Sequence, residues 1–328
     1  MDQNESTATA PKRSITAWIT DKVALLLVLV AGATLAAYLG RLHFLPELLT
    51  HFRGLYAVAA LVLTAYLLMA RSWRWAALGL AVAVVNLAHV APYYVPPERT
   101  TAAPNLRMLT ANVLSSNREH ERLLSLIRAQ KPDVVVLLEV DYVWFRAIAS
   151  LRNDYPYVTH KLRHDNFGIA MISRLPFTSQ ELLDLGGSHV PALLAQVKVA
   201  GHPVNLMAVH AFPPGEAAMA RTRDAQLHAA AKHARKSAEP IVVCGDFNAA
   251  PWSPIFADTL SRSGLKDARR GFGTQGTWPA QYAPCLIPLD HCLASPAIVV
   301  RRFQTLPGIG SDHLPILVEL VVPVGAGS

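Results

Sequence analysis

Several apolar segments of this sequence are followed or preceded by polar residues that can bind a metal ion or a phosphate group. These residues are Asn112, Glu139, His210, Asp246 with Asn248, and the pair Asp312-His313. Carboxylate and amide oxygens suit hard divalent cations, and imidazoles bind anions or transfer protons near neutral pH. One such residue alone more often marks a capped turn or a solvated sheet edge. The repeated occurrence of these residues at the ends of apolar segments therefore predicts a site that binds a metal ion or a phosphate group.

The apolar segments beside these residues are short and rich in β-branched side chains, which is typical of strands. They cover residues 106–110, 134–138, 169–172, 204–209, 241–244 and 316–321. Strand ends lie along one rim of a sheet, so side chains far apart in the chain can converge there. In the most specific segment, Gly245 permits a tight turn, and Asp246 and Asn248 flank an aromatic residue that can face the core.

Helical segments alternate with these strands. One helix is predicted over residues 117–130, with Ser115, Ser116 and Asn117 as candidate N-terminal caps, and another over residues 215–237. This alternation predicts packed sheets covered by helices.

Four motifs occur in an order that resembles a known family. They are T-A-N-V at 110–113, P-D-V-V-V-L-L-E at 132–139, G-D-F-N at 245–248 and S-D-H-L-P at 311–315. Residues 106–322 resemble the endonuclease/exonuclease/phosphatase superfamily, which includes pancreatic-type deoxyribonucleases, abasic-site endonucleases, neutral sphingomyelinases and inositol polyphosphate phosphatases. The resemblance implies an α/β fold of two packed β-sheets flanked by helices, a four-layer sandwich.

The resemblance also implies a metal site. Glu139 would be the principal ligand of Mg²⁺, or of Mn²⁺ in its place, with Asn112 and Asp312 nearby. The absence of a cluster of Cys and His residues argues against zinc.

The remaining roles follow from the same resemblance. Asp290 would hold the imidazole of His313, while Asn248 and His210 would bind non-bridging phosphate oxygens, and His210 could also protonate the leaving group. Asp246 would orient or activate the attacking water, and His313 would act either as a base or as a phosphate ligand. The sequence leaves open which of these two residues removes the proton.

Some features bear on the substrate. Leu138 stands where abasic-site endonucleases carry Gln, which weakens a DNA-repair function. The net charge of +7 is spread along the chain and forms no concentrated basic stripe of the kind that binds duplex DNA. Trp278, in a G-T-W-P segment, could either line a substrate cleft or pack in the core.

The first hundred residues contain three apolar stretches, at about 23–39, 55–70 and 75–90, without Asp, Glu, Lys or Arg. Each is close to the shortest helix that crosses a hydrocarbon layer about 30 Å thick. Helices of a soluble bundle would show polar faces at helical spacing, and these stretches do not. We therefore expect a membrane region with three transmembrane helices over residues 1–94, a linker over 95–104 and a catalytic domain over 105–328.

Basic residues around the stretches indicate the topology. One face would carry Lys12, Arg13, Lys22, Arg71 and Arg74, and the other would carry Arg41, Arg53 and Arg99. The positive-inside rule then places the catalytic domain outside the cytoplasm, anchored in a membrane that we expect to be the bacterial inner membrane.

The sequence thus predicts a membrane-anchored, metal-dependent phosphoesterase that hydrolyses phosphodiesters or phosphomonoesters by in-line attack of water. Its substrate would be a lipid head group, a nucleic acid or a small phosphate ester. Membrane lipid is expected as a partner, and no obligate protein partner is evident from the sequence. The alternatives are a nuclease acting on extracytoplasmic DNA, an inactive binding module of the same fold, and a transporter. Of the three cysteines, Cys285 and Cys292 could pair, although free buried thiols are favoured.

Overall fold

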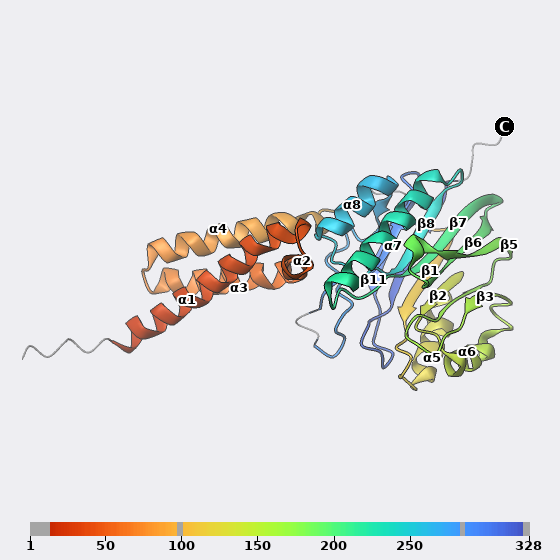
Figure 1. Ribbon diagram of the computed structural model, residues 1–328, viewed down its shortest axis with the longest axis horizontal. Helices are drawn as coiled ribbons and strands as arrows, with labels where there is room; N and C mark the ends of the chain where they lie inside the picture. The colour runs from red at the N-terminus through yellow and green to blue at the C-terminus, as the bar shows by residue number, and fades with distance from the viewer. Residues whose placement is uncertain (1–13, 97–100, 283–285, 324–328) are drawn as a thin grey trace, which may run out of the picture.

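The computed structural model describes residues 14–96, 101–282 and 286–323. It consists of an elongated group of N-terminal helices and a layered α/β domain, which meet at the short helix α2 (Figure 1). The amino end of α1 and the turn between α3 and α4 both lie at the end of the helical group farthest from the α/β domain.

The N-terminal helices are α1 (Ile15–Ala36) with its 3-10 extension η1 (Ala37–Arg41), α2 (Phe44–Thr50), α3 (Arg53–Met69), α4 (Trp73–Val90) and η2 (Ala91–Tyr93). Two helical segments, Ile15–Arg41 and Trp73–Tyr93, are long and apolar enough to cross a membrane. A third candidate exists only if α2 and α3, which are bent by 60° relative to each other, form one broken span. All three predicted stretches overlap these helices, but the first helix begins well before residue 23.

The α/β domain contains two six-stranded sheets. The first has the order β11-β12-β1-β2-β4-β3, with bounds Val299–Thr305, Ile316–Val321, Leu106–Asn112, Val134–Leu138, Ile169–Ser173 and Tyr157–Lys161. The second has the order β5-β6-β7-β8-β10-β9, with bounds Phe177–Asp184, Pro191–Val199, His202–His210, Ile241–Asp246, Asp290–Ala294 and Lys266–Asp267.

Each sheet is buried on both faces. Met108 and Val136 of the first sheet meet Leu206 and Val242 of the second in the core between the sheets. The outer face of the first sheet packs against α5 (His120–Gln130) and α6 (Tyr142–Ile148), and that of the second against α7 (Ala217–Lys236) and α8 (Pro254–Ser263). The predicted four-layer α/β sandwich is therefore confirmed.

The predicted strands are six of the eight interior strands, because strands covered on both faces form continuous apolar runs. The interior strands β6 and β10 were not predicted, and β6 includes Gln196 and Lys198 within its apolar run. Edge strands such as β3 and β5 are largely exposed and mixed in composition, so their sequences gave no such signal. Of the predicted helices, α7 is confirmed. The predicted caps of α5 are wrong, since that helix begins at His120 and Asn117 instead braces a loop by donating to the Val113 and Ile309 carbonyls.

Gly245 explains why β7 and β8 can approach so closely beside the polar cluster. Its φ is 149°, and a Cβ there would lie 1.8 Å from the Val209 carbonyl oxygen. Only glycine tolerates this position, which directly precedes Asp246. Cys244 and Cys292 lie opposite each other in β8 and β10 as buried free thiols, and Cys285 lies outside the described residues.

The N-terminal helices are docked onto the α/β domain through polar contacts. Glu47 of α2 forms a buried ion pair with Arg223 of α7. Arg41 forms a second ion pair, 2.9 Å from Asp258. The Arg41 side chain is 62% exposed. The Tyr93 hydroxyl donates to the Pro251 carbonyl. Through these contacts the helices and the domain pack as one unit.

The buried pair should contribute far more to this docking than the exposed one. We expect Glu47→Ala to destabilise the detergent-solubilised full chain by about 3 kcal/mol, because it leaves the buried Arg223 without this partner. The value is at the low end for breaking a buried ion pair, since Asp224 still contacts Arg223. The control Arg41→Ala should cost about 0–1 kcal/mol. Thermal unfolding measures both changes, and equal effects would contradict the docking described above.

Candidate active site

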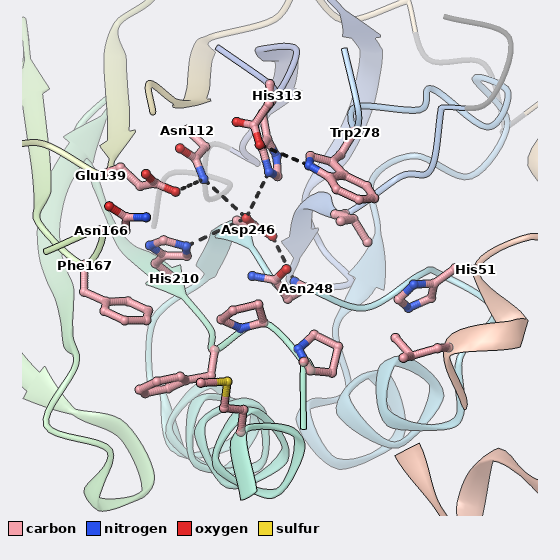
Figure 2. A pocket seen from close by; sticks show the side chains of 18 residues that line it. His51, Asn112, Glu139, Asn166, Phe167, His210, Asp246, Asn248, Trp278 and His313 are labelled. Atoms are coloured by element: carbon pink, nitrogen blue, oxygen red, sulfur yellow. Dashed lines mark hydrogen bonds and ion pairs between the residues drawn. The ribbon is translucent and has the colours of Figure 1, made fainter. Parts of the chain in front are cut away.

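The polar strand ends converge on one rim of the sandwich, as Figure 2 shows. Asn112 ends β1 and Glu139 follows the parallel strand β2, while His210 and Asp246 end the parallel strands β7 and β8. Strand β12 runs antiparallel to β1, so the residues that precede it arrive at the same rim. Antiparallel pairing also sets Asp290, the first residue of β10, opposite Asp246.

Asp246, Asp290 and His313 form the tightest cluster at this rim. One ligand atom from each lies within 4.8 Å of the others, and all three side chains are buried. His313 Nδ1 is 2.8 Å from Asp290 Oδ2, and His313 Nε2 is 3.6 Å from Asp246 Oδ2. The predicted pairing of Asp290 with His313 is thus present in the structure.

Charge compensation sets the protonation of this cluster. Burial lowers the pKa of His313, but the carboxylates of Asp290 and Asp246 outweigh it and raise the pKa to about 10. Burial raises the pKa of Asp246 to about 6, against the opposing effect of His313. His313 is therefore a cation at neutral pH, and Asp246 titrates close to neutrality.

Glu139 and Asn112 form the second part of the site. Glu139 has a φ of 62°, and its two oxygens accept from Asn112 Nδ2 at 2.9 Å and from the Ser115 backbone N–H at 3.2 Å. Burial raises the pKa of Glu139, and the negative charge of Asp312 raises it further. Asn112 turns its amide nitrogen toward Glu139 and its oxygen toward the Leu114 N–H.

His210 and Asn248 complete the set. His210 is buried, which lowers its pKa and keeps it neutral, and its Nδ1 has no hydrogen-bond partner among the described residues. Its Nε2 lies 3.8 Å from Asp246 Oδ2. The Asn248 backbone N–H donates to Asp246 Oδ1 at 2.9 Å, and its side-chain amide donates to the Ala211 carbonyl. The G-D-F-N turn therefore fixes the orientation of the Asp246 carboxylate.

The donor set fits a divalent cation. Glu139 and Asp312 repel each other, and a cation near them would remove the cost of keeping buried carboxylates ionised. The Asp246–Asp290–His313 cluster is more compact, but its Asp290–His313 pair is already engaged in a direct hydrogen bond. Glu139 with Asp312 is accordingly the better candidate for the metal position.

Apart from Asp290, which lies behind His313, the predicted site residues line a cleft of about 510 Å³. Trp278 lines it, donates from Nε1 to Asp312 Oδ2 at 3.1 Å and also packs against Ile287 and Leu289, so it combines the two roles left open for this residue. His291, by contrast, is fully buried between Arg269 and the Ala249 carbonyl and has a structural role.

Several lining residues were not singled out by sequence reasoning. They are Asn166, Phe167, Phe212, Pro213, Pro214 and Met219 from loops and α7, and Leu48 and His51 from the N-terminal helices. Asn166 accepts a hydrogen bond from the Ser115 hydroxyl at 2.7 Å. No motif marks these positions, because apolar lining residues resemble core residues in sequence.

Comparison with known proteins agrees with this geometry. The sequence profile described as "Endonuclease/Exonuclease/phosphatase family" matches residues 109–313. No sequence of a curated protein matches the chain significantly.

Solved structures share the fold at low sequence identity. An endonuclease/exonuclease/phosphatase from Beutenbergia cavernae is 23% identical with a TM-score of 0.55, covering 67% of this chain and 72% of that one. TDP2 from D. rerio, complexed with a single-stranded DNA product, is 18% identical with a TM-score of 0.57 over 66% and 98% of the two chains. The human Nocturnin catalytic domain, with bound sulfate, is 21% identical with a TM-score of 0.54 over 68% and 97%.

Members of the matched family are hydrolases that act on phosphoester bonds and are typically dependent on divalent metals. The match extends over more than half of the chain and contains every polar strand end described above. This chain belongs to the endonuclease/exonuclease/phosphatase family.

Proposed function

We propose that this protein is a membrane-anchored, divalent-metal-dependent phosphoesterase that hydrolyses its substrate by in-line attack of water. The observation that carries the proposal is the convergence of Glu139, Asp246 and His313, each from a different strand end, on one cleft. An inactive binding module would not need a base, a cation and a metal ligand in contact range of one another.

Glu139 and Asp312 would hold the metal, with Asn112 orienting Glu139 or adding its own oxygen. Mg²⁺ is the preferred ion, with Mn²⁺ as the alternative, because the ligands are oxygens. Bound there, the ion supplies positive charge that polarises the phosphoryl group and stabilises charge on its oxygens. Ser115 and Asn112 keep the Glu139 carboxylate aimed into the cleft.

The protonation states favour Asp246 as the residue that takes the proton from water. A pKa of about 6 is suited to a general base near neutral pH. His313, which is already protonated, would instead donate from Nε2 to a phosphate oxygen, while Asp290 fixes its ring. Neutral His210 and the Asn248 amide would hold the other oxygens, with His210 nearest the leaving group.

Helices α1, α3 and α4 would form the anchor, within residues 1–94, followed by a linker over 95–104 and the catalytic domain over 105–328. The direction of the helices supports an arrangement with the N-terminus on one side and the catalytic domain on the other. The charge bias supports an extracytoplasmic domain on a bacterial inner membrane, although Lys12, Arg13 and Arg99 lie outside the described residues.

The first prediction concerns catalysis. With Mg²⁺ and bis-p-nitrophenyl phosphate, Asp246→Asn should lower kcat roughly 10²- to 10⁴-fold because it removes the base. Glu139→Gln should lower activity by a similar factor and shift the required Mg²⁺ concentration upward. Glu181→Gln on the exposed strand β5 is the control and should retain full activity. If Glu139→Gln behaves like this control, the metal assignment is wrong.

The second prediction tests the metal without a turnover assay. Mg²⁺ at about 100 times its dissociation constant should stabilise the folded chain by about 2.7 kcal/mol, because only the folded state assembles the ligands. Differential scanning calorimetry should show this shift for the unaltered chain and lose it in Glu139→Gln. If Mg²⁺ stabilises the Glu139→Gln variant as much as the unaltered chain, the ion binds at another site.

The third prediction concerns topology. Reporter fusions after Ser328 and within the loop at Arg71 to Arg74 should report opposite sides of the membrane, with the former outside the cytoplasm. If only Ile15–Arg41 and Trp73–Tyr93 cross the membrane, α4 still separates these two fusions, and a third fusion before Met1 would report the same side as the fusion after Ser328. A cytoplasmic signal from the fusion after Ser328 would remove external substrates from consideration.

A further inference from the structure

A second hollow lies between the N-terminal helices and the catalytic domain. This tail groove, of about 390 Å³, is lined by Leu55, Val58 and Leu61 of α3, Leu87 of α4, and Trp252 and Ile287 of the catalytic domain. Its volume lies within the range of roughly 300–1,000 Å³ that is usual for small-molecule sites. Along α3 the tail groove runs from Gly54 to Leu61, about 10 Å at the rise of an α-helix.

The tail groove adjoins the catalytic cleft. His51 lines both hollows, and Leu48, three residues earlier, lines the cleft. In Figure 2, His51 lies at the end of the cleft opposite Glu139 and Phe167, with Asn248 between them. A ligand whose phosphate lies beside Asn248 could therefore extend past His51 into the tail groove.

The residues that line the two hollows do not suit a nucleic acid, which carries a phosphate group at every nucleotide. Among the described residues that line them there is no Lys or Arg. Nucleic-acid grooves carry basic side chains along the backbone of the strand, because each neighbouring phosphate must be neutralised. A single phosphoester attached to an apolar body matches the lining better.

We propose that the tail groove binds a hydrocarbon chain of a membrane lipid whose phosphoester group is the substrate in the cleft. The inference rests on the proposed function and names its substrate class. The exposure of the wall residues indicates the occupant. Leu87, 36% exposed, lies on the candidate span that includes α4, and Val58 and Leu61, 61% and 43% exposed, lie on α3, which spans if it forms one broken span with α2. The groove then opens onto the layer where lipid chains lie. A chain entering from that layer exchanges one apolar environment for another and needs no passage through water.

A series of esters that differ only in tail length tests the proposal. The full chain, in nanodiscs of dimyristoylphosphatidylcholine with Mg²⁺, is given ethyl, octyl and hexadecyl p-nitrophenyl phosphate, which share one reacting phosphodiester. We expect kcat/KM to rise roughly tenfold or more from ethyl to hexadecyl, because a tail held in the groove keeps its phosphoester in the adjoining cleft. Plasmid DNA, assayed beside them, should be cleaved more slowly than the hexadecyl ester.

Two glycine substitutions separate groove binding from simple partitioning into the bilayer. A Cβ placed on Gly54, in the groove, or on Gly32, on α1 away from it, meets no atom within 4 Å. Gly54→Leu would fill the groove and should reduce the hexadecyl-to-ethyl ratio to within about threefold of unity, whereas Gly32→Leu should keep the full ratio. Equal ratios in both variants, or no dependence on tail length, would overturn the proposal.

A different result would count against the proposed function: the full chain would then not hydrolyse even the ethyl ester. In that case the groove is still testable with hexadecyl phosphate carrying a terminal diazirine. Photolysis should label peptides containing Leu61 or Leu87, and Gly54→Leu should suppress the label. Labelling spread evenly over α1, α3 and α4 would show that no chain occupies the groove.

Discussion

Burial of several ionisable groups at the junction of two sheets is the constraint on which the rest of this structure depends. An isolated buried carboxylate would be expelled or protonated, because its loss of hydration costs several kcal/mol. Asp246 and Asp290 remain in the rim because His313 places a positive charge between them. The same balance raises the pKa of Asp246 to about 6 and that of His313 to about 10, and the division of roles that we propose between them rests on this difference.

The directions of the strands in the two sheets bring the residues of this cluster together at one rim. Parallel pairs β1–β2 and β7–β8 bring their carboxyl ends to one rim, and the antiparallel strands β12 and β10 deliver His313 and Asp290 from the opposite direction. Gly245 permits the close approach of β7 and β8 just before the Asp246 carboxylate. Asn112 and Asp246, 134 residues apart in the chain, thereby meet within hydrogen-bond distance.

The N-terminal helices, which we propose as the membrane anchor, also contribute residues to the lining of the candidate active site. Glu47 reaches Arg223, whose guanidinium also donates to the Asn248 carbonyl at 3.2 Å, so the docking of α2 is linked directly to the G-D-F-N turn. Leu48 and His51 close one end of the catalytic cleft. A soluble fragment starting at the linker would lack this wall.

The sequence by itself determined six of the eight interior strands, the layered α/β class, the apolar N-terminal region and most of the polar site, because these depend on local patterns and on motifs that keep their order. It did not determine the edge strands, the interior strands β6 and β10, the start of α5 or the break between α2 and α3. Strands of mixed composition such as β6 form no continuous apolar run, and loop contacts such as those of Asn117 are made with distant backbone. It also left the base undecided, because protonation depends on burial and on charges that only folding brings together. The cleft wall formed by Leu48 and His51, and the groove behind it, were decided by tertiary structure alone: they arise where two separately patterned regions dock, and apolar residues at such a junction look in sequence like any other buried residue.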